Sequence, residues 1–228
     1  MKKRTIIALT IFIVIIIAVI VLAIYQRNNI SAIITTVSKT EEEIAVELDN
    51  SKKQLAEELE DKYSTMVDDL TADEEKKIMN GELSVEEAVE SINKKYEAKK
   101  TQNTNTNNNN SSSKVDELIG DKVIELYSLK AYYLGQLGQM EATVKREYSA
   151  LPKEKKNLLG VKEIANKYMG TAMSLLNQCD SQVNELISQL EKELKSLNAD
   201  TSIFKTIRDT YEKEKALKKA YYLKKLEG

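Results

Sequence analysis

The stretch TIIALTIFIVIIIAVIVLAI occupies residues 5–24 and decides how the rest of the chain is interpreted. It carries no charged side chain, and its most polar members are two threonines. A helix of this length spans roughly 30 Å, the thickness of the hydrocarbon core of a bilayer. A helix also pairs its own backbone polar groups, for which lipid offers no partners. We therefore predict a single transmembrane helix over residues 5–25.

The residues that flank this segment predict its orientation. Residues 1–4 read MKKR, whereas the nearest basic residues after the segment are Arg27 and Lys39. Because excess Lys and Arg mark the cytoplasmic side, we expect a cytoplasmic tail over 1–4 and an extracytoplasmic C-terminal part, held at the cell membrane by a signal-anchor. The alternative is a cleaved signal peptide, which has a shorter apolar core and a small-residue cleavage site that residues 21–26 lack.

The composition outside this segment is typical of long helices. The 228 residues include only 7 glycines and 1 proline, and no tryptophan. Charge is unevenly distributed, because residues 25–100 hold 11 basic and 19 acidic residues, whereas residues 101–228 hold 20 and 17. We therefore predict an all-α protein whose membrane-proximal region is acidic.

Residues 26–100 are predicted to form an acidic helical stalk region. Apolar residues recur over 30–70 mostly at intervals of three, four or seven, which is typical of a coiled coil or an amphipathic helix. Polar residues interrupt this pattern at Glu41 and at Ser51 or Lys52. We expect one coiled-coil-like helix over 30–70, which either pairs with a second copy of the chain, giving a homo-oligomer, or receives the helix that follows.

Two capping boxes mark the next helices. The pattern T-x-x-E occurs at 71–74 and S-x-x-E at 84–87. In such a box the first side chain bonds the backbone of the fourth residue, and the fourth side chain bonds the backbone of the first. Asn80-Gly81, between the two boxes, predicts a helix end. We expect helices over about 72–79 and 85–99.

A segment without any apolar side chain follows, since residues 101–113 read TQNTNTNNNNSSS. Such a low-complexity segment cannot bury a core, and we predict a disordered linker that separates the stalk region from a distal domain. Asn-x-Ser sequences in this segment would be glycosylation sites only in a eukaryotic secretory pathway.

The distal domain, residues 114–228, is predicted to be an antiparallel three-helix bundle. Three apolar stripes with helical spacing are separated by Pro152 and by a polar turn. Short connections make neighbouring helices antiparallel. The predicted helices cover about 115–149, 155–197 and 202–226.

One short pattern occurs twice in this domain. Ala-Tyr-Tyr-Leu-x-x-Leu is found at 131–137 and again at 220–226. In an up-down-up bundle the two tyrosine pairs should sit at one height. They would form either an aromatic-lined ligand pocket or a layer of amphipathic core residues. The candidate aromatic layer comprises Tyr132, Tyr133, Tyr221 and Tyr222.

Charge separation predicts a basic tip at the end of the bundle that carries its first turn and the C-terminus. Such a tip would attract an anionic envelope polymer, lipid headgroups or the chain's own acidic stalk. Other membrane proteins are further candidate partners of the protein. Nucleic acid is disfavoured because no recognised binding motif occurs. The alternative is an ordinary solvated helix surface. The candidate anionic-partner patch comprises Lys145, Arg146, Lys153, Lys155, Lys156, Lys218, Lys219, Lys224 and Lys225.

Several sequence signals of common catalytic chemistry are absent, although paired carboxylates are plentiful. There is no histidine, which removes the commonest general base and metal ligand, and the only cysteine is Cys179. We interpret Cys179 as a small buried hydrophobe, with an intermolecular disulfide as the alternative. The acidic run 68–75 lacks the alternation of a calcium loop and is interpreted as helix capping. We predict no catalytic residue, no metal, no cofactor and no enzymatic activity.

These observations lead to two hypotheses about function. The first is a single-pass, membrane-anchored, extracytoplasmic helical protein that acts as a binding or scaffolding component of a cell-envelope assembly through protein interaction. The second is an extracytoplasmic sensor or ligand-binding module that signals through a membrane partner. A sensor normally needs a cytoplasmic output, and the predicted inside portion is only a few residues long.

Overall fold

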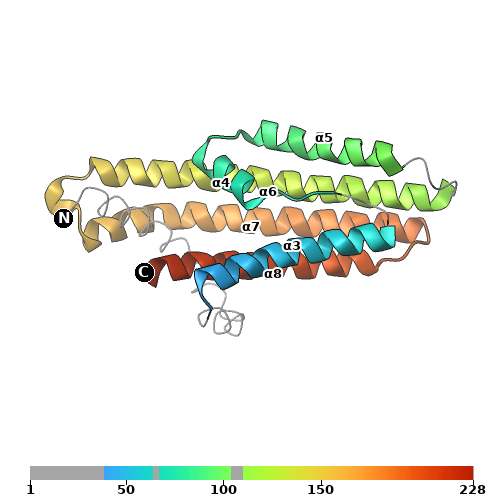
Figure 1. Cartoon of the computed structure of the whole chain (residues 1–228). Coiled ribbons are helices and arrows are strands. Elements are labelled where there is room, and N and C mark those ends of the chain that lie inside the picture. The colour runs from blue at the N-terminus through green and yellow to red at the C-terminus, as the bar shows by residue number, and fades with distance from the viewer. Residues whose placement is uncertain (1–38, 64–66, 104–109, 228) are drawn as a thin grey trace. The chain divides into compact units, whose positions relative to one another are not determined.

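The computed structural model of the protein describes residues 39–63, 67–103 and 110–227. Within these ranges the chain is helical, contains no β-strand and forms a helical bundle, so the all-α prediction is confirmed (Figure 1). The elements are α3 (Glu41–Tyr63), α4 (Ala72–Asn80), α5 (Val85–Asn103), α6 (Asn110–Ala150), the 3-10 helix η2 (Lys153–Lys155), α7 (Leu158–Ser196) and α8 (Ser202–Glu227).

The predicted transmembrane helix over 5–25 lies outside the described residues. Among the helices that are described, none combines the length and the apolar character needed to cross a bilayer.

Both predicted capping boxes are present with the expected hydrogen bonds. The hydroxyl of Thr71 accepts from the backbone N–H of Glu74 at 3.2 Å, and the Glu74 carboxylate accepts from the Thr71 N–H at 2.8 Å. Ser84 and Glu87 exchange the equivalent bonds at 3.1 and 2.9 Å. Gly81 ends α4 with a φ of 72°, a left-handed conformation that glycine adopts without steric cost.

The prediction of one helix over 30–70 is wrong. Helix α3 ends at Tyr63, and residues 67–71 form no regular structure before α4 begins. The apolar spacing did not reveal this break because Val67 and Leu70 are buried in the core even though they are not helical. Side chains supply hydrogen bonds in place of a helix, since the Leu70 N–H donates to Asp69 and its carbonyl accepts from Lys52.

Helices extend into both ends of the segment predicted to be a linker. Helix α5 continues to Asn103 and α6 begins at Asn110, whereas the linker was expected over 101–113. Adding residues to an existing helix costs less than starting one, so polar residues can continue a helix that packing has already stabilised. The division of the chain into a stalk region and a separate distal domain stays a prediction.

The chain divides into two compact units. Of the described residues, the first unit contains those up to Asp49, Leu137–Gln178 and those from Lys213 onward, and the second contains those within Asn50–Gln136 and Cys179–Glu212. Helices α6, α7 and α8 each contribute residues to both.

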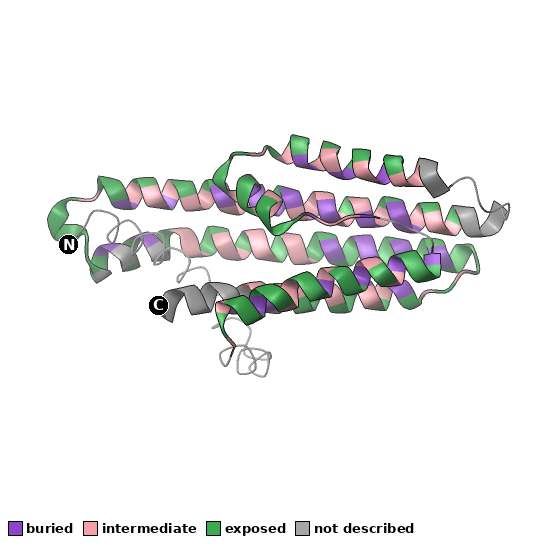
Figure 2. Cartoon of the chain, viewed as in Figure 1, coloured by how far each residue is buried: buried purple, intermediate pink, exposed green. Residues whose placement is uncertain are grey.

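The second unit holds the larger core. Helix α3 contributes Leu55 and Leu59, α5 contributes Ala88 and Ile92, and each pair is spaced by one helical turn. Figure 2 shows buried residues recurring along one side of these helices. The core therefore combines side chains from the region predicted as a stalk with side chains from the region predicted as a bundle. The buried members from the latter are Ile119, Val123, Tyr127, Ala131, Leu134, Val183, Ile187, Leu190, Leu194, Ile203 and Ile207.

The first unit holds two smaller apolar clusters. One joins α6 to α7 and contains the buried residues Val144, Tyr148 and Ile164. The other joins α3 to α8, where Ile44 packs with two residues of α8. Small clusters of this kind provide less hydrophobic stabilisation than the core of the second unit, because that stabilisation scales with buried apolar area.

A glycine allows α5 to approach α6 closely. A Cβ atom at Gly120 would lie 2.7 Å from Cζ and 2.9 Å from Cε2 of Tyr96, and it would overlap the hydroxyl oxygen. Tyr96 is itself a buried core residue. A second glycine, Gly135, has the same role beneath α5, because its Cβ would lie 2.7 Å from Val85.

We predict that Gly120→Ala lowers the free energy of unfolding by about 1–3 kcal/mol, because the added methyl forces Tyr96 out of its packed position. Gly170→Ala is the matched control, since a Cβ there has no neighbour within 4 Å and alanine favours a helix by about 0.5–1 kcal/mol over glycine. Urea unfolding of the full chain followed by circular dichroism measures both. Equal stability of the two variants would contradict the close packing of α5 on α6.

Candidate functional site

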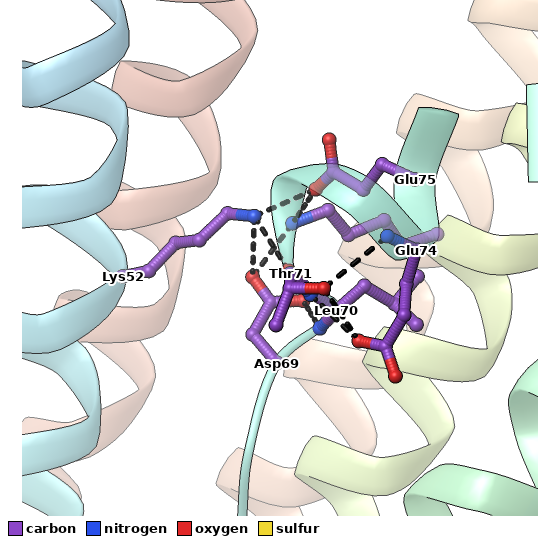
Figure 3. A network of polar contacts seen from close by, with 7 residues as sticks. Lys52, Asp69, Leu70, Thr71, Glu74 and Glu75 are labelled. Carbon is purple, nitrogen blue, oxygen red and sulfur yellow. Dashed lines mark hydrogen bonds and ion pairs between the residues drawn. The ribbon is translucent and has the colours of Figure 1, made fainter. Parts of the chain in front are cut away.

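Two lysines and two carboxylates form a network in the second unit (Figure 3). Lys52 of α3 lies 2.7 Å from the Glu75 carboxylate of α4 and 3.7 Å from that of Asp69. Lys130 of α6 lies 2.6 Å from Asp69 and 3.0 Å from Glu75. Lys52 also donates to the carbonyl of Leu70 at 2.7 Å. Three helices and the irregular segment 67–71 therefore meet at one set of charges.

This network suits a structural role better than a chemical one. Its four charged side chains are only 8–16% exposed, and their formal charges cancel. Buried charges are tolerated only when they are paired in this way. Each carboxylate lies within 4 Å of both lysines, so all four groups are used in mutual pairing. We conclude that the network holds the segment 67–75 against α3 and α6.

The predicted aromatic layer is only partly described. Tyr133 is buried, its hydroxyl donates to Gln182 at 2.7 Å, and burial raises its pKa. Tyr132 is 46% exposed, and its ring meets that of Tyr133 edge-on at 5.2 Å. The side chains of Tyr221 and Tyr222 lie outside the description, and these residues belong to the other compact unit. The convergence of the two pairs stays a prediction.

A polar contact that the sequence did not reveal involves Tyr211 of α8. Its hydroxyl lies 2.5 Å from a carboxylate oxygen of Asp180 and 3.7 Å from the sulfur of Cys179, both on α7. Burial raises the pKa of Tyr211 far above its ordinary value, and the neighbouring Cys179 adds to this effect. The sequence predicted Cys179 to be a small buried hydrophobe, and the structure leaves it half-buried. Apolar spacing carried no signal for the contact between Tyr211 and Asp180.

The predicted basic patch divides into neutralised and exposed members. Lys145 pairs with Glu141 one turn earlier at 2.5 Å, whereas Arg146 is exposed. The lysines at 153, 155 and 156 are exposed on the α6–α7 turn. Lys218 is half-buried on α8, within the same compact unit. The side chains of the other three members, Lys219, Lys224 and Lys225, lie outside the description.

The α6–α7 turn, residues 151–160, has a defined backbone. Its η2 segment is closed by N–H donation from Lys155 to the carbonyl of Pro152 at 2.9 Å. The side-chain oxygen of Asn157 then accepts from the N–H groups of Leu159 and Gly160 at 2.9 and 3.3 Å, which caps α7. This cap explains why α7 begins at 158 instead of the predicted 155.

Glycine is required at the last position of this turn. A Cβ atom at Gly160 would overlap the carbonyl oxygen of Lys155 and lie 3.1 Å from its carbonyl carbon. In addition, Lys156 donates from its ammonium group to the carbonyl of Ser149 at 2.7 Å. The turn is therefore held both at its backbone and by one of its own lysines.

A lysine of α7 near the turn is paired with a glutamate of α6. Glu147 of α6 accepts hydrogen bonds at 2.6 Å from the ammonium of Lys167 and from the hydroxyl of Tyr168. These two bonds lower the pKa of Glu147, and the same carboxylate raises the pKa of Lys167. Lys167 is thus compensated by an acidic neighbour on α6.

No family model, no curated protein and no solved structure matches this chain. Among the described residues, no group of three or more His, Cys, Asp or Glu side chains is placed to hold a metal ion. The function must therefore be inferred from the residues and contacts described above.

We predict that Asp69→Asn destabilises the protein by about 3 kcal/mol, because two partly buried ammonium groups would then face one carboxylate. Asparagine retains an acceptor for the Leu70 N–H, so the effect reports the lost charge. Removing the excess positive charge as well, as in Asp69→Asn with Lys130→Met, should recover most of this loss and keeps the acceptor for the Leu70 N–H. Chemical denaturation of the full chain measures each variant.

Glu90→Gln is the matched control for the network. Glu90 pairs with Lys94 at 2.6 Å on the exposed face of α5, where both side chains are largely in water. Its loss should cost less than about 0.5 kcal/mol. If Asp69→Asn were as mild as Glu90→Gln, the network would not be holding the segment 67–75.

Proposed function

We propose that this protein is a single-pass, membrane-anchored, extracytoplasmic helical protein that binds or scaffolds an anionic component of a cell-envelope assembly. The observation that carries the proposal is the α6–α7 turn, which presents exposed lysines at 153, 155 and 156 on a fixed backbone. A rigid display of charge lowers the entropic cost of binding.

The electrostatics of the turn support an anionic partner. Residues 151–163 contain four lysines and two glutamates, which leaves two positive charges in a short exposed stretch. The nearest ion pair within it, Lys155 with Glu163, is 4.0 Å long and exposed, so it is weakly neutralising. Local positive charge raises the concentration of an anion at the surface and accelerates its association.

A binding role is also favoured because buried polar side chains of the second unit are paired with one another. In the second unit the carboxylates of Asp69 and Glu75 are paired with lysines, and the Tyr133 hydroxyl is bonded to Gln182. The chain has no histidine to act as a general base near neutral pH. We therefore propose a binding protein and not an enzyme.

The membrane anchor is supported by the sequence of residues 5–25 and the basic residues before it. Protease added to intact cells should digest the C-terminal part of the protein and leave a cytoplasmic marker protein untouched. Survival of the C-terminal part on intact cells, followed by its digestion after lysis, would contradict an extracytoplasmic location.

The anionic partner can be tested with polyphosphate as a soluble probe. We expect the full chain to bind it with an affinity that falls steeply as salt is added, because exposed charges are screened. Lys153→Gln with Lys155→Gln should weaken binding by roughly fivefold to thirtyfold, at about 0.5–1 kcal/mol for each charge.

The matched control for this charge variant is Lys94→Gln with Lys192→Gln, which removes two exposed lysines from other helices. This control should bind polyphosphate as the unaltered chain does. Binding that is independent of salt, or an equal loss in both double variants, would contradict the assignment of the turn as the anion-binding surface.

A further inference from the structure

An exposed leucine stands among the lysines of the α6–α7 turn. Leu159 is 71% exposed, the highest value among the large apolar side chains that the structure describes as exposed. Lys155 and Lys156 precede it, Lys162 follows it, and all three are exposed. The proposed anion-binding surface therefore has an apolar group at its centre, which attraction to a soluble anion does not explain.

The construction of the turn separates this leucine from the apolar cluster below it. Leu151, at the start of the turn, packs against the cluster of Val144, Tyr148 and Ile164. Leu151 also lies beneath Gly160, where a Cβ would come within 3.0 Å of its Cδ1. Leu159, whose backbone N–H donates to the Asn157 side chain at 2.9 Å, is exposed to water instead. The Asn157 cap therefore fixes the backbone of a leucine that does not join the cluster.

Lysines around a projecting apolar side chain match the chemistry of a lipid surface. Anionic headgroups bind the ammonium groups, and the layer just below them accepts an apolar side chain. A soluble polyanion offers only the first of these interactions. A protein partner would normally cover about 800 Å² of this surface, and a single leucine among lysines offers little apolar area for such an interface.

We infer that the α6–α7 turn binds an anionic lipid surface, with Leu159 entering the headgroup region while the lysines at 153, 155 and 162 contact phosphates. This inference depends on the proposed function, in which the same turn takes an anionic partner. The predicted membrane segment over 5–25 would keep such a surface at a high local concentration.

The experiment uses the full chain inserted in nanodiscs of phosphatidylcholine, so that its predicted membrane helix already lies in a bilayer and does not itself insert into the vesicles. These nanodiscs are mixed with vesicles that contain phosphatidylglycerol, and flotation of the vesicles through a density gradient measures the protein they carry. Vesicles of pure phosphatidylcholine and soluble polyphosphate are tested in parallel. We expect binding to the phosphatidylglycerol vesicles and little binding to the neutral ones.

The variants separate the apolar contribution from the charge. Leu159→Ser should weaken binding to the anionic vesicles by about fivefold to tenfold and leave polyphosphate binding unchanged. Lys153→Gln with Lys155→Gln should weaken binding to both probes, by about fivefold for each lysine on the vesicles. The matched controls are Leu197→Ser and Lys192→Gln, at two exposed positions near the C-terminal end of α7, where Leu197 is 42% exposed. Neither control should change binding to the vesicles or to polyphosphate.

The outcomes distinguish the inference from the proposal on which it depends. If Leu159→Ser bound anionic vesicles as the unaltered chain does, the lipid inference would be overturned, and salt-sensitive binding to polyphosphate would still support an anionic partner. If the unaltered chain bound neither probe, both would be overturned. Circular dichroism melting of Leu159→Ser should match that of the unaltered chain, and an unfolded variant is replaced by Leu159→Gln.

Discussion

The pairing of Lys52 and Lys130 with Asp69 and Glu75 is the constraint on which the second unit depends. Placing four charges where water has little access costs free energy, and only their mutual pairing offsets that cost. The four groups come from α3, the segment 67–71, α4 and α6. Their geometry therefore decides where the segment between α3 and α4 runs, and it lets Val67 and Leu70 reach the core without a helix to carry them.

Polar groups in the first unit divide between those that stabilise the fold and those that remain at the surface. Lys145 and Lys167 are compensated by glutamates on α6, and the hydroxyl of Tyr168 reinforces the second of these pairs. The turn that joins α6 to α7 differs, because its backbone is satisfied by Asn157 while its lysines and Leu159 face water. A fixed backbone with exposed cationic and apolar side chains suits binding, and this contrast supports the function proposed above.

Local signals in the sequence predicted much of the secondary structure. The boxes at 71–74 and 84–87, and the stop at Gly81, depend on residues only a few positions apart, whose hydrogen bonds form whenever the chain turns there. The break after Tyr63 was missed because apolar spacing continues through it. Within the predicted anionic-partner patch, Lys145 is paired with Glu141, whereas the lysines of the α6–α7 turn are exposed. The aromatic layer stays a prediction, because only two of its four members, Tyr132 and Tyr133, have described side chains.

The sequence by itself determined the helical class and the helix boundaries at the two capping boxes and at Gly81, because these follow from composition and local capping. The tertiary structure alone decided that Lys130 meets Asp69, that Tyr211 meets Asp180, and that Leu159 stays outside while Leu151 packs within. The reason is physical. Many lysines and carboxylates have equivalent local surroundings, and only the packing of distant helices selects which of them come within bonding distance.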